Sequence, residues 1–223
     1  MVAKLPYSVE RGFQPVVVIA RGHLAAVVAP TSEIKSIKDL IAEAKKNPGK
    51  VRYSSAGVGS FPHFDMEIFA RRASVDMIHI PNKTGAAGMV NDLVVGDAQV
   101  GIINSASTAA MIKAGKMKPI AVAAEQRLAE YPDVPTMAES GFPSMTVGSW
   151  QGLFAPKGVP ADVVKKLYAV MMKVMDDANV RKRLAEGGVD VVVSKSPEAF
   201  SQFVKAENLR WGKVIKEAGV VAE

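Results

Sequence analysis

The sequence contains no cysteine, and this absence removes several classes of chemistry at once. Disulfide bonds, thiolate metal sites and cysteine nucleophiles all require a thiol. Histidine is also scarce. The three in the chain are His23, His63 and His79, and their spacing matches no metal-binding motif. We therefore expect no metal site, no cofactor and no catalytic residues.

Long apolar runs are missing too. No stretch reaches the length of about 20 residues that crossing a bilayer requires. Met1 is not followed by a charged segment and a continuous apolar stretch, so the pattern of a signal peptide is not found. Two interpretations stay open: the protein is cytosolic, or an export signal lies outside this sequence.

The charge of the chain is moderately basic, with 28 Lys and Arg against 22 Asp and Glu and a net charge of +6. A positive balance favours anionic partners in general. The basic residues are dispersed and form no stripe interleaved with aromatic residues, so we expect no nucleic-acid partner. With 48% hydrophobic and 22% charged residues, the composition is that of a globular protein.

Apolar and β-branched runs alternate with amphipathic stretches over residues 24–123. Alternating strands and helices with short connections predict an α/β domain with a mainly parallel sheet. The expected strands are 14–20, 24–29, 51–53, 75–80, 98–103 and 117–123, and the expected helices are 36–47, one beginning at Pro62, 86–95 and 108–114.

The pattern changes after residue 124. Residues 125–143 are rich in proline, glycine and acidic residues and are interpreted as a linker with a short helical turn. The following part predicts strands at 150–156 and 189–193 and helices at 160–175, 179–185 and 197–218. Two strands are too few for a separate sheet. Trp150 is interpreted mainly as a packing residue.

One stretch, Val51–Arg72, combines a strand, a loop of Ser and Gly and an amphipathic helix with Phe64, Ile68 and Phe69 on its apolar positions. Ser60 is a candidate N-cap, and Pro62 suits the first helical position. The first N–H groups of a helix and its dipole attract anions, and glycine permits close approach. The loop is therefore either a carboxylate-binding loop or an ordinary turn.

Three connections at strand ends carry small or polar residues, namely 54–60, 82–88 and 104–107. Parallel sheets bind ligands at the carboxyl ends of their strands, so these connections could form one cleft. His63 either contacts a bound anion or packs in the helix, whereas His79 is interpreted as a core residue. The serines lack a patterned base, which argues against nucleophilic catalysis.

Several motifs in this order resemble one known family. They are YSSAGVGSFPH at 53–63, HIPNKTGAAGMVNDLVVGDAQVGI at 79–102, AGKMKPIAVAAEQRLAEYPDVPTMAESGFP at 114–143, WQGLFAPKGVP at 150–160 and ENLRWGKVIKEAGV at 207–220. The chain resembles the extracytoplasmic solute-binding receptors of tripartite tricarboxylate transporters, the Bug receptors, over essentially its whole length.

The resemblance implies an α/β, periplasmic-binding-protein-like fold of type II (Venus flytrap), with one complete α/β domain and an incomplete second one. It implies a periplasmic, non-enzymatic receptor that delivers a small carboxylate or dicarboxylate to a membrane permease. The expected division is 1–23 as a remnant of the first domain, 24–124 as the ligand-binding domain, 125–144 as the linker and 145–223 as the rest of the first domain.

The resemblance also assigns a candidate site. One carboxylate would be held by Ser54, Ser55, Gly57, Gly59, Ser60 and His63, and the rest of the pocket would be shaped by Asn82, Lys83, Gly85 and Asn104. Lys83 is equally well explained as a surface lysine. Many family members carry Asp in the segment of Asn104, and because a neutral amide pairs poorly with a ligand ammonium, we expect a carboxylate without an amino group.

The resemblance also implies that this sequence begins part-way through the first domain, around residues 5–20, without the N-terminal segment that family members carry. We expect a truncated receptor, a misplaced start codon or a fragment that covers its apolar surface by forming homo-oligomers. Two further alternatives stay open: a self-associating fragment without tight ligand binding, and a small-molecule enzyme with an anion-binding loop.

Overall fold

The chain forms two compact units in the computed structural model, which describes residues 7–143, 145, 148–186 and 189–218. Of the described residues, those in the ranges 7–22 and 149–218 belong to unit 1, and those in the range 23–148 belong to unit 2. The first six residues of the expected first-domain remnant lie outside the described residues, as do residues 144, 219 and 220 of the expected linker and the C-terminal motif.

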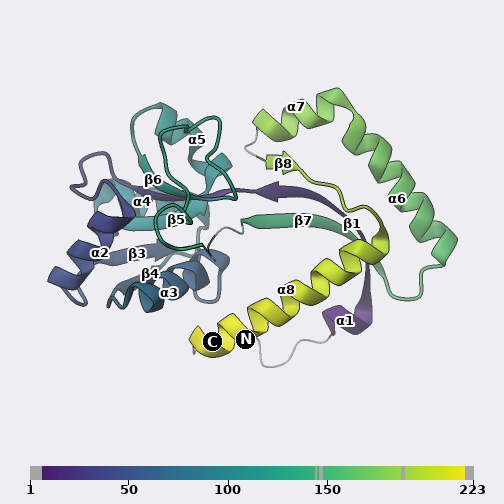
Figure 1. The fold of residues 1–223 in the computed structure, drawn as a ribbon, viewed down its shortest axis with the longest axis horizontal. Coiled ribbons are helices and arrows are strands. Elements are labelled where there is room, and N and C mark those ends of the chain that lie inside the picture. Colours follow the sequence, from purple (N-terminus) through teal and green to yellow (C-terminus); the bar gives the residue numbers. More distant parts are fainter. Residues whose placement is uncertain (1–6, 144, 146–147, 187–188, 219–223) are drawn as a thin grey trace. The chain divides into compact units, whose positions relative to one another are not determined.

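Unit 2 is built on a five-stranded sheet in the order β4-β3-β5-β2-β6 (Figure 1). The strands are β2 (Leu24–Val28), β3 (Arg52–Ser55), β4 (Ile78–Pro81), β5 (Val100–Asn104) and β6 (Lys118–Ala123). β3 is parallel to β4 and β5, whereas β2 is antiparallel to β5 and β6. The α/β class predicted from the sequence is therefore confirmed. The sheet is mixed, with two parallel and two antiparallel pairings, so the mainly parallel arrangement that was expected holds only for β4, β3 and β5.

Helices cover both faces of this sheet. On one face, α2 (Ile37–Lys46) and α3 (Phe61–Ala73) enclose a core that includes Leu40, Tyr53 and Phe69. On the other, α4 (Ala86–Val95) and α5 (Ser105–Lys113) enclose a second core around Leu93 and Ile103. The strands are apolar on both sides for this reason, because each face of the sheet is buried.

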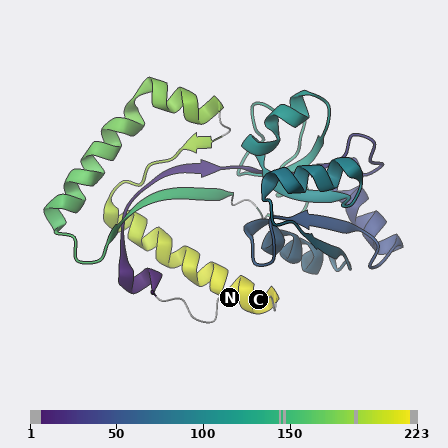
Figure 2. The same cartoon turned by 180° about the vertical axis from the view of Figure 1, so that it is seen from behind.

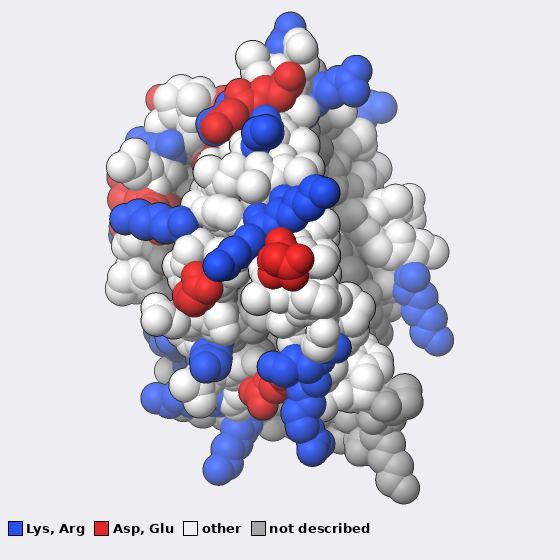
Figure 3. All heavy atoms as spheres, turned by 90° about the vertical axis from the view of Figure 1, so that its right-hand side faces the viewer, with Lys and Arg blue, Asp and Glu red and all other residues white. Residues whose placement is uncertain are grey.

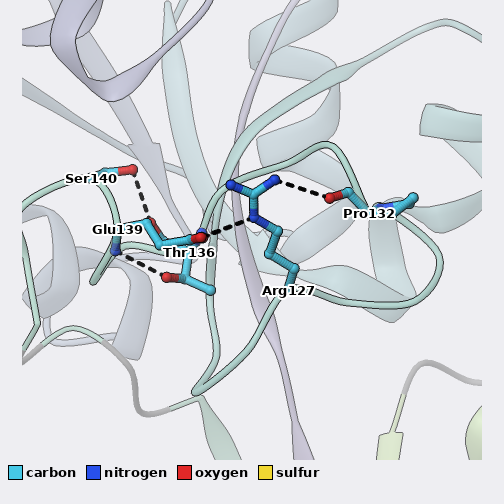
Figure 4. A network of polar contacts seen from close by, with 5 residues as sticks. All are labelled: Arg127, Pro132, Thr136, Glu139 and Ser140. Carbon is cyan, nitrogen blue, oxygen red and sulfur yellow. Dashed lines mark hydrogen bonds and ion pairs between the residues drawn. The ribbon is translucent and has the colours of Figure 1, made fainter.

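Residues 125–143, predicted to be a linker, pack into unit 2. Thr136 pairs with Val122 at the end of β6, and Met137 and Phe142 are buried in the first core. Figure 4 shows the polar network that fixes the segment: Glu139 accepts from Thr136 N at 2.7 Å and from Arg127 Nε at 3.0 Å. Glu139 N also donates to Thr136 Oγ1 at 3.0 Å, so these two residues bond each other in the pattern of a capping box at the start of the turn 137–141.

Unit 1 contains a three-stranded antiparallel sheet in the order β7-β1-β8. Its strands are β7 (Ser149–Pro156), β1 (Phe13–Gly22) and β8 (Val189–Val191), and a short helix α1 (Val9–Gly12) precedes β1. This sheet agrees with the expectation that the C-terminal part cannot form a separate sheet, because β7 and β8 both pair with β1. Its central strand comes from the N-terminal end of the chain, and local patterns do not specify such a distant partner.

Two helices pack on the sheet of unit 1 (Figure 2). α6 (Ala161–Asp176) covers Val17, Leu153 and Ala155 and is followed by α7 (Ala178–Glu186), whereas α8 (Pro197–Ala218) places Phe200 against Trp150 and Phe154. Side chains alternate across a strand, so α6 and α8 contact opposite faces of β7. The packing role predicted for Trp150 is confirmed.

The described surface carries mixed charge. On the face drawn in Figure 3, Lys and Arg side chains stand apart among acidic and uncharged residues. None of the helices in the described part of the chain combines the length and the apolar character that crossing a bilayer requires.

Candidate functional site

The strands β3, β4 and β5 end at one edge of the unit 2 sheet, which we call the carboxyl edge. Ser55 lies opposite Pro81 in the register, and Asn82 N donates to Ser55 O at 2.9 Å. The 56–60 loop after β3 therefore lies beside the connection that begins at Asn82. Asn104, the last residue of β5, belongs to the same edge. The structure thus brings together the three connections singled out in the sequence on one edge.

Ser54 and Ser55, expected in the loop, are the last two residues of β3 and are fully buried. Ser54 Oγ donates to Asp92 Oδ2 at 2.5 Å. Ser55 Oγ accepts from Gly57 N at 3.1 Å and lies 2.6 Å from His79 Nε2. Both hydroxyl groups are bonded to the protein's own polar groups. They therefore hold the end of β3 and the start of the loop in place.

The glycines give the 56–60 loop its shape. Gly57 and Gly59 have φ angles of +107° and +77°, which residues other than glycine rarely adopt. Gly59 N donates to His63 Nδ1 at 3.1 Å, and Ser60 N donates to Gly57 O at 3.2 Å. The N–H groups of both glycines are thus bonded within the protein.

Two buried seryl hydroxyls at the carboxyl edge have no hydrogen-bond partner among the described residues. Ser60 is the N-cap residue of α3, but its side chain makes no capping bond, and its Oγ is buried. Ser105 is the first residue of α5, and its Oγ is also buried without a partner. Pro62 is the second helical residue of α3, one position later than predicted. Both hydroxyls lie where a helix begins and anions are favoured.

Asp92 is a residue that the sequence analysis missed. It is buried on α4 and accepts from Ser54 Oγ and from Asn82 Nδ2, the latter at 3.1 and 3.2 Å. Asn82 Oδ1 in turn accepts from Thr84 N at 2.9 Å. A Cβ atom at Gly88 would overlap Asn82 and Thr84. Asp92 therefore connects the end of β3 to the segment after β4. The helical pattern of residues 86–95 in the sequence does not indicate these contacts.

A stack of three rings lies beneath the 56–60 loop. His63 and His79 are stacked with their ring centroids 3.9 Å apart and their planes nearly parallel, and the Tyr53 ring centroid lies 5.0 Å from that of His79. Tyr53 donates its hydroxyl to Glu67 at 2.6 Å. His79 was predicted to be a core residue, but its bond to Ser55 makes it part of the support of the loop.

Burial sets the protonation of these rings. It lowers the pKa of His63, against the charge of Glu67, which raises it. Burial, followed by the charge of His63, lowers the pKa of His79 to about 4. Burial and the bond to Glu67 raise the pKa of Tyr53. At neutral pH both imidazoles are therefore neutral, and each ring nitrogen is either a donor or an acceptor.

The remaining predicted residues lie at the rim. Lys83 is exposed, Gly85 precedes α4 with a φ of +69°, and Asn104 is half-buried, with its carbonyl accepting from Thr108 Oγ1 at 3.4 Å. Among the described residues, no group of three or more His, Asp or Glu side chains is arranged to hold a metal ion.

Comparisons with known proteins connect this geometry to a family. The model of the "Tripartite tricarboxylate transporter family receptor" matches residues 1–220. A protein of Pseudomonas sp. (strain P51), from the tcbD-tcbE intergenic region, is 35% identical over 96% of this chain. The chain spans only 63% of the length of that relative.

Two solved structures extend the likeness to three dimensions. An R. palustris protein solved with adipate has 30% identity and a TM-score of 0.87, covering 98% of this chain and 73% of its own. MatC from Rhodopseudomonas palustris, with bound malate, has 28% identity and a TM-score of 0.82, covering 96% and 73%. The fold is thus an α/β fold of the periplasmic-binding-protein kind. Sequence and structure agree that this chain belongs to the receptor family of the tripartite tricarboxylate transporters.

Proposed function

We propose that this chain is a non-enzymatic, periplasmic solute-binding receptor that captures a small carboxylate or dicarboxylate at the carboxyl edge of unit 2 and delivers it to a membrane permease. The observation that carries the proposal is the pair of buried, unpartnered hydroxyls of Ser60 and Ser105. Each lies at the start of a helix, where backbone N–H groups favour an anion.

The roles of the residues follow from their contacts. The 56–60 loop and His63 hold one carboxylate group, and the buried Ser54 and Ser55 keep that loop in place. The pocket continues along Asn82, Lys83, Gly85 and Asn104. Lys83 attracts the anion, as the net charge of +6 does at longer range. The carboxylates bound by the adipate and malate structures support this substrate class.

A thermal-shift screen of the purified chain tests the proposal. The panel holds adipate, malate, succinate and citrate, with amino acids and nucleotides as controls. A ligand at a hundredfold excess over its Kd adds about 2.7 kcal/mol to the stability. This corresponds to a rise in Tm of roughly 5–10 °C for a chain of this size. If no carboxylate shifts the Tm, the proposal fails.

Two matched variants locate the site. Gly59→Ala and Gly96→Ala each place a Cβ at a positive φ with nothing within 4 Å of it, so both cause similar backbone strain. Gly59 lies in the 56–60 loop, whereas Gly96 caps the far end of α4. We expect only Gly59→Ala to weaken carboxylate binding by tenfold or more. Equal affinities of the two variants would exclude the 56–60 loop as the binding loop.

The type of carboxylate is tested with matched ligand pairs. Because Asn104 carries no charge to pair with an ammonium group, we propose that succinate binds more tightly than aspartate and glutarate more tightly than glutamate. Calorimetry of each pair measures the difference. Tighter binding of either amino acid would overturn this preference without affecting the receptor assignment.

A further inference from the structure

The bond between Gly59 and His63 specifies the protonation of the ring at the 56–60 loop. Gly59 N donates to His63 Nδ1 at 3.1 Å, so Nδ1 carries a lone pair and the proton of the neutral ring is on Nε2. Likewise, Ser55 Oγ accepts from Gly57 N. The protein's own acceptors therefore occupy the two glycine N–H groups that would otherwise face an anion.

A proton at His63 Nδ1 would change this arrangement. The lone pair would be lost, and Gly59 N–H and His63 Nδ1–H would be two donors that face each other without an acceptor between them. A carboxylate oxygen supplies the missing acceptor and a compensating negative charge. The loop in which Gly59 N–H is bonded to His63 Nδ1 and a loop that gives this N–H to an anion thus require different protonation states of the same ring.

Charged and titratable groups surround His63 on several elements. Glu67 lies one turn later on α3 and has its oxygen bonded to Tyr53 of β3, and His79 of β4 stacks on the ring. Asp92 of α4 lies behind the loop, bonded to Ser54. The stacked His79 opposes a second positive charge, while Glu67 and the carboxylate of a ligand favour a charge on His63.

We propose that capture of a carboxylate at the 56–60 loop takes up one proton at His63, which releases Gly59 N–H from His63 Nδ1 to the ligand. This inference rests on the function proposed above and assigns to His63 the role of a proton-linked ligand residue. The proton comes from solvent on binding and returns to it on release. Affinity therefore rises as pH falls, by about tenfold per pH unit while the unliganded ring is neutral.

Isothermal titration calorimetry measures the proton directly. Adipate, or the panel member with the largest thermal shift, is titrated at pH 7 in phosphate and in imidazole buffers, whose ionisation enthalpies differ. The slope of binding enthalpy against ionisation enthalpy gives the number of protons taken up, which we expect to be about one. A ring that only packs against its neighbours would give no uptake.

Three single substitutions assign the proton, since the chain has three histidines. His63→Asn places Oδ1 where Nδ1 was, so it keeps an acceptor for Gly59 N–H but does not titrate; we expect binding with no uptake. His23→Gln removes the third imidazole but leaves the bond between Gly59 and His63 in place, so we expect it to keep full uptake. His79→Gln retains a hydrogen-bond partner for Ser55 Oγ, and we expect this variant still to take up a proton at His63.

The outcomes separate this inference from the proposed function. If carboxylates bind without proton uptake, or if uptake survives in His63→Asn, the inference is wrong and the receptor assignment stands. If no carboxylate binds, the proposed function fails. The amide NMR signal of Gly59, recorded without ligand, tests whether protonation of His63 releases Gly59 N–H. The signal should shift as His63 titrates, and an unchanged signal would contradict the release of this N–H.

Discussion

Unit 2 and unit 1 bury their hydrophobic residues to very different extents. Unit 2 has its sheet between two continuous cores, one with twenty buried residues and one with nine. The core under α6 in unit 1 has three, and α6 leaves a stripe of apolar side chains exposed: Val163, Leu167, Val170 and Val174. The residues of the candidate site all belong to unit 2, which has the larger buried cores beneath its loops.

The difference concerns how rigidly each unit holds its polar groups. Ser54, Ser55 and Asp92 are all buried at the carboxyl edge, so the 56–60 loop is supported by groups that have little freedom to move. In unit 1 the corresponding polar cluster is Glu207 with Arg210, Trp150 and Trp211, held by α8. Both tryptophans of the chain lie in unit 1, so their fluorescence monitors that unit alone.

The largest expected effect is in the first core of unit 2. Phe69→Ala removes a ring that is 1% exposed and should cost about 3–5 kcal/mol of stability. Urea unfolding followed by far-UV circular dichroism measures it, with Leu209→Ala, which is 78% exposed, as the control. We expect the urea midpoint followed by tryptophan fluorescence to change less than the midpoint followed by circular dichroism. Identical changes in both midpoints would mean that the two units unfold together.

Acidification should also act mainly on unit 2. The folded pKa of His79, about 4, and that of His63 both lie below the unfolded value of 6.5. Neutral rings therefore stabilise the fold above pH 6.5, and this stability is lost as pH falls from 6.5 towards 4. Because His79 is only partly buried, we expect a loss of roughly 1–3 kcal/mol.

Unfolding curves at pH 7, 6 and 5 measure this loss. His79→Gln should flatten the pH dependence in far-UV circular dichroism, while tryptophan fluorescence changes little in either protein. A pH dependence that His79→Gln leaves unchanged would show that another group titrates.

A smaller effect is expected where β7 meets α8 in unit 1. A Cβ atom at Gly152 would overlap the Phe200 ring and lie 3.1 Å from Val17 O, so Gly152→Ala should cost about 1–3 kcal/mol. Gly212→Ala is the matched control, because nothing lies within 4 Å of its Cβ, and it should stabilise α8 by about 0.5–1 kcal/mol. Tryptophan fluorescence measures both, and carboxylate binding should survive in both.

The smallest effect is expected on the exposed stripe of α6. Val170 is 50% exposed, so Val170→Lys should change the stability by less than about 0.5 kcal/mol. Unfolding at several protein concentrations measures it. A larger or concentration-dependent effect would contradict this and mean that the stripe is covered in solution, as the expected homo-oligomer requires.

Local patterns were sufficient for most of the secondary structure. The capping serine before α2, the apolar spacing of α3 and the glycine at the end of α4 act within one or two turns of the chain, and the predicted elements agree with those observed. The candidate loops were found because glycine and serine between a strand and a helix are local signals. Their positions at one edge follow from the parallel sheet.

What the sequence alone determined is therefore the elements, the α/β class and the position of the 56–60 loop, since these depend on neighbouring residues. Tertiary structure decided which residues support that loop. Asp92 meets Ser54 across 38 positions, and His79 meets Ser55 across 24. It also made β1 the central strand of unit 1. Such contacts join residues that are distant in the sequence, so the pattern of any single segment does not contain them.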